Sequence, residues 1–214
     1  MTEDWLARWA KGRTGWHEED GNAGLKAHWP SIESNGNRRS RVLVPLCGKT
    51  PDLLWLADQG HEVVGIELSE IAIEQLFAEH DLAYRLEEGE YLDRYRAVEI
   101  PLTLYCGDYF CFEDEPFDAL FDRGALVALP EALRTAYAEH TRNLLRPGAT
   151  KMIITLEYDQ SITPGPPFAV SAEELAVAWS DLRRVAEYDD IDNCPPKFRA
   201  AGLTEILEVV WLST

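Results

Sequence analysis

Short apolar runs that alternate with helical patterns are the feature that most constrains the fold of this chain. Residues 42–44 (Val-Leu-Val) form a brief continuous apolar run, which is typical of a strand buried on both faces of a parallel sheet. A helical pattern follows over 51–59, with apolar residues spaced three and four apart and Gly60 marking its end. The next run, 62–67 (EVVGIE), predicts a second strand. Continued alternation of this kind predicts an α/β fold, a mostly parallel sheet with helices on both faces.

Similar patterns extend the prediction to the end of the chain. Further strands are expected over 102–106, 117–121, 152–156, 183–188 and 204–212. Residues 86–100 are polar and irregular and predict a loop or an insertion. Helices are expected to begin after Ser69 and Ser171, each acting as a cap, and at Pro130. The helix after Pro130 would turn one face to the core, made of Leu133, Ala136, Tyr137, His140 and Leu144.

Net charge restricts the class of partner. The 214 residues include 38 acidic and 20 basic side chains, a formal net charge of −18. Such a chain is repelled by nucleic acid and by anionic membrane surfaces, so we expect neither as a partner. The densest basic run, 38–41 (Arg-Arg-Ser-Arg), is expected to be a solvated loop, as is the acidic pair Asp189-Asp190. A small molecule or a protein remains as the partner.

The spacing of cysteines indicates the redox compartment, and the spacing of histidines indicates whether a metal is bound. The four cysteines form no CxxC pair, which indicates a reducing compartment. The N-terminus has acids early and no apolar core of a signal peptide, and no run of 18 apolar residues occurs. We therefore expect a cytoplasmic protein. The five histidines show no metal-ligand spacing, so no metal is expected.

The ends of the first two strands predict a nucleoside site. Gly48 follows the first strand, where backbone would have to approach a ligand closely, although the turn lacks both GxGxxG and the phosphate-loop pattern and could be an ordinary strand-to-helix turn. Glu67 ends the second strand, nineteen residues beyond Gly48, and an acid there can accept both ribose hydroxyls. The alternative is an acid favoured by the dipole of the following helix. Together the two features predict an adenosine group held without a pyrophosphate clamp.

Two later strands also end in polar residues. Asp108-Tyr109 follow the third strand and could read the amino edge of adenine, unless Asp108 is simply a turn residue. Arg123 follows the fourth strand, where a guanidinium could bind a carboxylate or steer an anionic substrate. Its alternative role is an ion pair with Asp122.

At this point the sequence resembles a known family, the thiopurine S-methyltransferases. These belong to the class I S-adenosylmethionine-dependent methyltransferases, which have a Rossmann-like, seven-stranded, mostly parallel sheet. The resemblance runs from residue 5 to about 212, and its most specific part is the order of PLCGK at 45–49, GIELSE at 65–70 and DRGALVALP at 122–130. Further matching stretches are WLARW at 5–9, GRTGWH at 12–17, DLLWLA at 52–57 and GPPF at 165–168.

The resemblance implies a set of residues that bind S-adenosylmethionine. Trp9 matches a tryptophan that packs on the cofactor, and Leu46 matches a leucine that contacts it through its backbone. Glu67 matches the ribose ligand, and Asp108 and Tyr109 match the segment that flanks adenine. The product would be S-adenosylhomocysteine.

The resemblance also implies an acceptor side. Arg123 matches an arginine that touches both the cofactor region and the substrate, and Trp16 stands where the family places an aromatic residue over the acceptor. Lys197 occupies a position that is frequently arginine, which puts bidentate anion binding there in doubt. Transfer is an in-line displacement that depends on positioning, so no obligate catalytic side chain is expected.

We therefore expect a single methyltransferase domain over 1–214, with residues 1–30 as a helical lid bearing Trp5, Trp9, Trp16 and Trp29. The expected activity is methylation of aromatic or heterocyclic thiols such as 6-mercaptopurine, by a monomer. The nearest alternative is a methyltransferase for selenium or tellurium species or halide in detoxification. Two other classes stay open at this point: a non-catalytic sensor of adenosine-type ligands, and, less consistent with the missing GxGxxG, a dehydrogenase.

Overall fold

The computed structural model describes residues 2–33 and 39–213. Within it the chain divides into two compact units, the first ending at Phe117 and the second beginning at Asp118. Two parts of the predictions, Arg38 of the basic run and Met1 of the lid, lie outside the described residues. The expectation of a single domain with a lid stays a prediction.

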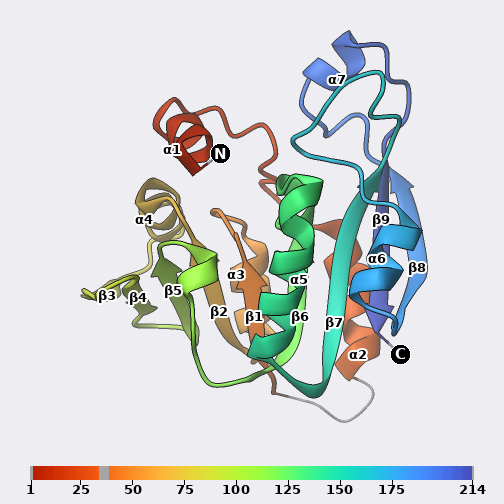
Figure 1. Cartoon of the computed structure of the whole chain (residues 1–214). Helices are drawn as coiled ribbons and strands as arrows, with labels where there is room; N and C mark the ends of the chain where they lie inside the picture. The colour runs from red at the N-terminus through yellow and green to blue at the C-terminus, as the bar shows by residue number, and fades with distance from the viewer. Residues whose placement is uncertain (1, 34–38, 214) are drawn as a thin grey trace. The chain divides into compact units, whose positions relative to one another are not determined.

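The strands of the first unit lie in the order β3-β4-β5-β2-β1 (Figure 1). Three of them are parallel neighbours, β1 (Arg41–Pro45), β2 (Glu62–Glu67) and β5 (Leu102–Cys106). β4 (Asp93–Ala97) pairs antiparallel with β5, and β3 (Tyr84–Glu87) pairs antiparallel with β4. Because β1, β2 and β5 are parallel, their carboxyl ends meet at one edge, which is where ligands bind in sheets of this type.

Helices connect these strands, as the alternating pattern predicts. α1 (Thr2–Ala10) and α2 (Ala23–Glu33) precede β1, α3 (Asp52–Asp58) joins β1 to β2, and α4 (Glu70–Glu79) follows β2. A short 3-10 helix, η1 (Tyr109–Cys111), follows β5.

The segment before α2 is tied to α3 through a buried carboxylate. Asp52 is fully buried, and its two oxygens accept hydrogen bonds from the Asn22 backbone N–H (2.7 Å) and the Thr50 hydroxyl (2.8 Å). The Asn22 side chain in turn accepts from the N–H of Leu25 in the first turn of α2 (2.9 Å). Trp29 of α2 is buried and donates its indole N–H to His61 Nε2 (3.0 Å). Trp29 is therefore part of the packed unit, which leaves Trp5, Trp9 and Trp16 as the indoles of the predicted lid.

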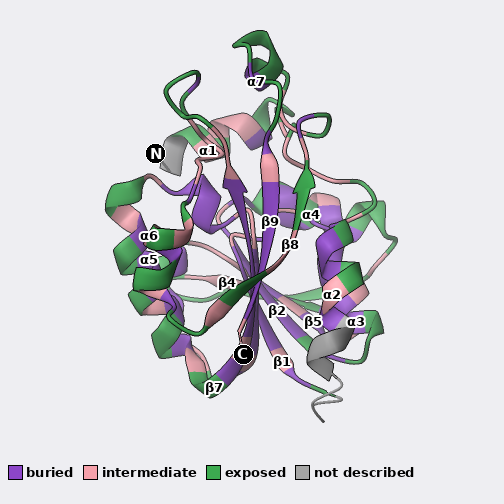
Figure 2. Cartoon of the chain, turned by 90° about the vertical axis from the view of Figure 1, so that its right-hand side faces the viewer, coloured by how far each residue is buried: buried purple, intermediate pink, exposed green. Residues whose placement is uncertain are grey.

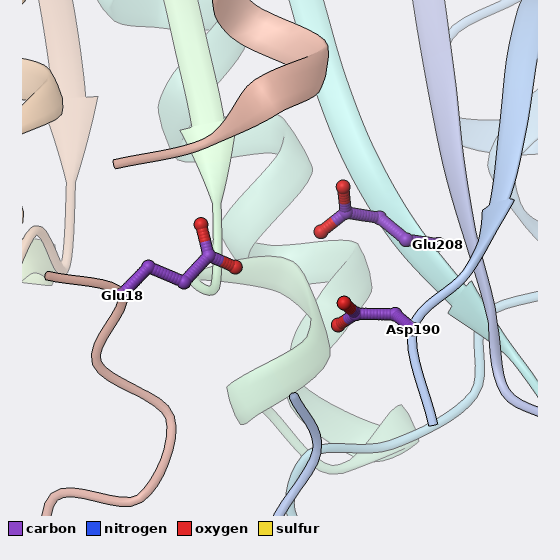
Figure 3. Close-up of side chains that lie close together, drawn as sticks. All are labelled: Glu18, Asp190 and Glu208. Carbon is purple, nitrogen blue, oxygen red and sulfur yellow. The ribbon is translucent and has the colours of Figure 1, made fainter. Parts of the chain in front are cut away.

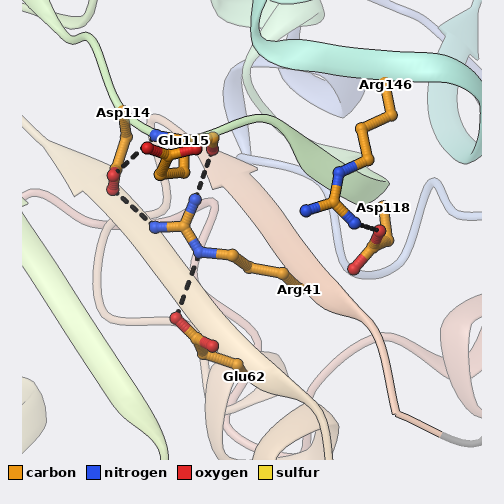
Figure 4. A network of polar contacts seen from close by, with 6 residues as sticks. All are labelled: Arg41, Glu62, Asp114, Glu115, Asp118 and Arg146. Atoms are coloured by element: carbon orange, nitrogen blue, oxygen red, sulfur yellow. Dashed lines mark hydrogen bonds and ion pairs between the residues drawn. The ribbon is translucent and has the colours of Figure 1, made fainter.

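Arg41 shows that the basic run is not simply a solvated loop. Its guanidinium contacts Glu62 Oε1 (3.1 Å), Asp114 Oδ2 (2.6 Å) and the Glu115 carbonyl (Figure 4). It also lies over the ring of Phe117, 4.2 Å from the ring centroid. The side chain is only 16% exposed, so the solvated-loop prediction is wrong for Arg41.

The strands of the second unit lie in the order β6-β7-β9-β8. They are β6 (Phe117–Arg123), which runs into this unit, β7 (Leu145–Glu157), β8 (Leu182–Asp189) and β9 (Leu207–Ser213). β9 pairs antiparallel with both β7 and β8. The helices are η2 (Leu126–Ala128), α5 (Glu131–Leu144), α6 (Ala172–Ala178) and α7 (Lys197–Ala200).

α5 begins after Pro130 as predicted, but the face that it buries is rotated. The buried residues are Arg134, Tyr137, Ala138, Thr141 and Leu144, whereas Ala136 is exposed and Leu133 only half-buried. Arg134 is buried because its guanidinium is satisfied: it donates to the Leu129 carbonyl (3.0 Å) and to both oxygens of Glu174 (2.9 and 2.7 Å). A paired arginine thus takes a place that the apolar pattern assigned to other residues.

The α/β class is confirmed, with a difference in the number of strands. The described residues form nine strands rather than seven, because the segment predicted as a loop over 86–100 contains the end of β3 and the whole of β4. β3 is exposed at all four positions, so no buried run marks it. β4 does carry a period of two, with Tyr95 and Ala97 buried and Arg96 exposed between them, a signal that the loop prediction missed.

Burial follows the strands. In Figure 2 strands such as β1, β2 and β9 are mostly buried, whereas β8 and the outer faces of α5 and α6 are exposed. Val42, Leu43 and Val44 are 0–1% exposed, as expected for a strand covered on both faces. No helix among the described residues is long and apolar enough to span a membrane.

Candidate active site

The turn after β1 reverses the chain through two left-handed residues. Leu46 has a φ of 47° and Gly48 a φ of 56°, and the N–H of Cys47 between them donates to the Ile66 carbonyl in β2 (3.0 Å). A Cβ on Gly48 would lie 3.3 Å from Cζ2 of Trp9, so the indole covers this glycine directly. Glycine is therefore required here both by the backbone angle and by the close approach of a ring.

Glu67 stands where β2 ends and links this turn to the next. The side chain is 7% exposed; Oε2 accepts from the Gly48 N–H (2.8 Å) and Oε1 from the Ser69 N–H (2.8 Å). Burial raises the pKa of Glu67, and the backbone N–H donors limit that rise. Ser69 precedes α4 as predicted, but its side chain makes no capping bond, so its expected role as a side-chain cap is wrong.

The residue that follows β5 is hydrogen-bonded to Glu67 as well. The N–H of Gly107 donates to the Glu67 carbonyl (2.9 Å), and a Cβ on Gly107 would lie 2.9 Å from the Tyr91 carbonyl oxygen. Asp108 is exposed, and its Oδ1 accepts from the Phe110 N–H (3.0 Å), which begins η1. Tyr109 is buried at 4% exposure. Asp108 thus has the turn role that the sequence left open, and one of its carboxylate oxygens has no part in that bond.

Aromatic rings gather on α1 and the loop that follows it. Trp16 lies edge-to-face against Trp5 (5.0 Å between ring centroids) and against Trp9 (5.8 Å). The Arg8 guanidinium lies 5.0 Å from the Trp5 ring centroid and 5.9 Å from that of Trp16. α1 contacts α4, and Trp9 is buried at 4% exposure. The first unit therefore brings together five of the predicted residues, namely Trp9, Leu46, Glu67, Asp108 and Tyr109, with Trp16 next to Trp9.

In the second unit, Arg123 ends β6 beside a buried carboxylate. Asp122 is fully buried; it accepts from the Tyr137 hydroxyl (2.7 Å) and from the Leu126 N–H (3.2 Å). Burial raises the pKa of Asp122 to about 6, against the opposing effect of these donors. The bond to Leu126 closes the DRGALV turn, which fixes the backbone that carries Arg123.

Lys197 is engaged with a loop. Its Nζ donates to the carbonyls of Pro164 (3.1 Å) and Pro166 (2.8 Å) and lies 4.7 Å from the Phe198 ring centroid. The hydroxyl of Tyr158 donates to the Pro167 carbonyl (2.6 Å). The Lys197 ammonium thus holds the proline-rich loop, which contains the GPPF stretch at 165–168.

A thiol and two acids near Arg123 were not predicted as a site. Cys194 Sγ lies 3.8 Å from Asp190 Oδ2, and the carboxylates of Asp190 and Glu208 have oxygens within 4.8 Å of each other (Figure 3). Burial and then Asp190 raise the pKa of Cys194 to about 12, while the charge of Arg123 lowers it. Glu208 is 6% exposed in β9 and Asp190 is half-buried, so the solvated-loop prediction is wrong for Asp190. An acid on an otherwise apolar strand was the available signal for Glu208. Glu18, the third side chain in Figure 3, belongs to the first unit.

Comparison with known proteins decides the family. A family model described as Thiopurine S-methyltransferase (TPMT) matches residues 1–214. The chain belongs to the thiopurine S-methyltransferase family. A thiopurine S-methyltransferase from Bordetella petrii is 42% identical to this TPMT-family chain over 217 residues, covering 98% of it and 96% of the relative. One from Pseudomonas fluorescens (strain Pf0-1) is 40% identical over 214 residues, covering 98% and 96%.

Solved structures support the fold of this TPMT-family member. The 1,6-didemethyltoxoflavin-N1-methyltransferase of Burkholderia thailandensis, solved with 1,6-didemethyltoxoflavin and S-adenosylhomocysteine, superposes with a TM-score of 0.62 at 20% identity, covering 100% of this chain and 87% of that one. A TehB-like SAM-dependent methyltransferase from Corynebacterium glutamicum gives 0.54 at 18% identity, covering 100% and 98%. The chain is thus an enzyme, an S-adenosylmethionine-dependent methyltransferase of the TPMT family.

Proposed function

We propose that this enzyme methylates the sulfur of aromatic and heterocyclic thiols, thiopurines such as 6-mercaptopurine among them. The acceptor class rests on the full-length relatives named thiopurine S-methyltransferase. The donor site rests on one structural observation: the buried Glu67 carboxylate is held by two backbone N–H groups at the strand edge, next to a glycine that Trp9 covers.

The residues of the first unit fit an adenosine-type donor. Each oxygen of Glu67 uses one acceptor position for a backbone N–H and keeps another, so the pair can accept the two ribose hydroxyls. The left-handed turn at Leu46 and Gly48 brings backbone beside Glu67, and Asp108 and Tyr109 follow the neighbouring strand, where we place adenine. When bound, S-adenosylmethionine supplies a methyl group on a positively charged sulfur.

On the acceptor side, this chain's task is to favour and orient an anion. The acceptor thiol ionises to a thiolate and gives its proton to solvent. The thiolate electron pair then forms the new carbon–sulfur bond, the bond from methyl to sulfonium breaks, and a neutral thioether leaves as S-adenosylhomocysteine. Arg123 lowers the pKa of an acceptor placed near it, so no general base is needed. We assign Trp16 to the acceptor ring, and Lys197 to the loop that it holds.

The aromatic group of α1 and the loop after it, Trp5, Trp9 and Trp16, is our candidate for the lid within residues 1–30. The indole of Trp9 already covers Gly48, and Trp5 and Trp16 pack against one another and against Arg8. A cover of this kind would exclude water from the sulfonium. We further propose that the enzyme is a monomer that works in the cytoplasm. Its partners are small molecules, because its net charge of −18 disfavours nucleic acid and anionic membranes.

The donor site is tested with Glu67→Gln. An amide leaves one of the two backbone N–H groups facing a donor and removes the charge, so we expect the affinity for S-adenosylhomocysteine, measured by calorimetry, to fall by about tenfold to a hundredfold. Glu74→Gln, an exposed change of the same type on α4, is the control and should bind as the wild type does. Equal affinity in both variants would remove Glu67 from the site.

The acceptor is tested with methyl-labelled donor and a panel of 6-mercaptopurine, thiophenol, selenite, tellurite and iodide. We expect turnover of the two thiols, and Arg123→Ala should raise the KM for the thiol with little change in donor affinity. Turnover restricted to selenite, tellurite or iodide would contradict the proposed acceptor class, and donor binding with no turnover of any acceptor would contradict catalysis.

A further inference from the structure

A pocket lies in the second unit, at the opposite end of β7 from the loop that Lys197 holds. It has a volume of about 320 Å³ and is formed where α5 and α6 end and β7 begins. Its lining includes three cations, Arg142, Arg146 and Lys151, together with Trp179 and a single acid, Asp181. No residue assigned above to the donor or the acceptor lines it.

The charge of this pocket is opposite to that of the chain. Acids outnumber bases by 38 to 20 in the whole sequence, whereas three bases face one acid here. Part of this charge is already used: Lys151 Nζ lies 2.7 Å from Asp181 Oδ2, and Arg146 pairs with Asp118 outside the lining (Figure 4). Even with both acids counted, the group retains a net charge of +1.

The cations keep hydrogen-bond donors to spare. Arg142 gives one N–H to the Ala178 carbonyl at the end of α6 (2.6 Å), and a guanidinium has five. Lys151 is nearly buried and uses its ammonium on Asp181 and on the Ala149 carbonyl (3.1 Å). Arg142 and Arg146 are exposed, so both can reorient toward a bound group.

An unpaired donor lies in the same lining. Trp179 is 3% exposed, and its indole N–H is buried with no hydrogen-bond acceptor among the described residues. A buried N–H without a partner costs about 1–3 kcal/mol, so native structures usually supply an acceptor. Trp179 lines the same pocket as the three cations, so we expect an oxyanion bound there to be the acceptor that the indole lacks.

We propose that this pocket binds the oxyanion of a small metabolite, a phosphate group, between Arg142, Arg146, Lys151 and the Trp179 N–H. Its volume falls at the lower end of the range for small-molecule sites, about 300–1,000 Å³, which leaves room for more than the phosphate itself. The site is separate from methyl transfer and does not depend on the proposed acceptor.

The experiment titrates the full chain with inorganic phosphate and, separately, with glucose 6-phosphate at constant ionic strength, followed by calorimetry and tryptophan fluorescence. We expect saturable binding that weakens about tenfold in the double variant Arg142→Gln/Arg146→Gln. Trp179→Phe keeps the ring but removes the N–H and should also weaken binding. Arg96→Gln, which removes one exposed positive charge from β4, is the control and should bind as the wild type does.

The two ligands distinguish the sources of phosphate. Tighter binding of glucose 6-phosphate would identify an ester as the ligand, and tighter binding of inorganic phosphate would identify the free ion. The proposal is overturned if the folded wild type binds neither saturably, or if both pocket variants bind as tightly as the Arg96→Gln control.

Discussion

At the scale of single residues, two buried carboxylates show how position sets protonation. Glu67 and Asp122 both lie at or next to the end of a strand, and both accept a backbone N–H of the following turn; Glu67 also accepts one from Gly48 in the turn after β1. Burial raises the pKa of each. Asp122 also accepts the Tyr137 hydroxyl, and its pKa of about 6 brings its titration into an accessible pH range.

Asp122 therefore makes folding stability depend on pH. Its pKa is about 6 in the folded chain against 3.8 in the reference state, so between these values the folded chain binds more protons than the unfolded one. The free energy of unfolding from this group is largest below pH 4 and falls as the pH rises to about 6, by about 3 kcal/mol at most. Asp122→Asn should lack this fall, because an amide stays neutral and can donate to the Tyr137 oxygen.

The measurement is urea denaturation of both proteins from pH 4 to pH 7. The difference in unfolding free energy, variant minus wild type, should grow in the variant's favour as the pH rises. Asp58→Asn, an exposed acid of α3, is the control and should show no such trend. A constant difference for Asp122→Asn would contradict the raised pKa.

Some residue roles could be predicted from sequence and others could not. The position of Glu67 at the end of β2 could be predicted because it is local information, and its role in binding the donor stays a prediction. Trp29 was assigned to the lid with the other indoles, but it packs on His61, thirty-two residues away in the chain. The bonds of Lys197 to a loop more than thirty residues earlier depend on the same kind of distant contact.

At the scale of elements, the turn between β1 and α3 is where backbone and ring meet. Gly48→Ala must place a Cβ both at positive φ and 3.3 Å from the Trp9 ring. Gly60→Ala at the end of α3 also places a Cβ at positive φ, but nothing among the described residues lies within 4 Å of that Cβ. Both variants should lose about 1–2 kcal/mol of stability, but only Gly48→Ala should also weaken binding of S-adenosylhomocysteine.

Thermal unfolding and calorimetry on the two glycine variants separate these effects. If Gly60→Ala weakened the binding of S-adenosylhomocysteine as much as Gly48→Ala, the contact with Trp9 would have no part in it.

The proline-rich loop offers a second test of an element. Lys197→Met removes two hydrogen bonds to the Pro164 and Pro166 carbonyls, so amide hydrogens of peptides covering 158–170 should exchange faster with solvent. Arg199→Gln changes a neighbouring cation of α7 that pairs with Asp192 instead, and it should leave that exchange unchanged. Equal exchange in wild type and Lys197→Met would show that the loop is held by other contacts.

The long, regular elements could be predicted, and the short or unusual ones could not. The strands with continuous apolar runs were found because burial on both faces leaves a plain pattern. The rotated face of α5 was missed because Arg134 is buried through its pairing with Glu174, forty residues away, which periodicity does not report. β3 was missed because its four residues are all exposed.

At the scale of the whole molecule, net charge is the dominant feature. A charge of −18 on 214 residues repels itself in the compact state. Raising NaCl from 10 to 300 mM should therefore raise the melting temperature by about 2–5 °C near pH 7.5, measured by scanning calorimetry. Near pH 4.6, the sequence isoelectric point, the same salt series should have little effect. Equal responses at the two pH values would rule out self-repulsion as the cause.

The boundary at Phe117 separates the proposed donor residues from two of the three proposed acceptor residues. Trp9, Leu46, Glu67, Asp108 and Tyr109 precede it, as does the acceptor residue Trp16, whereas Arg123 and Lys197 follow it. The residues that we propose for recognition of the methyl donor thus lie mainly in the N-terminal half of the chain. Recombination that exchanges the C-terminal half would replace Arg123 and Lys197 and so offers a route to new acceptors, while the donor-binding residues are kept.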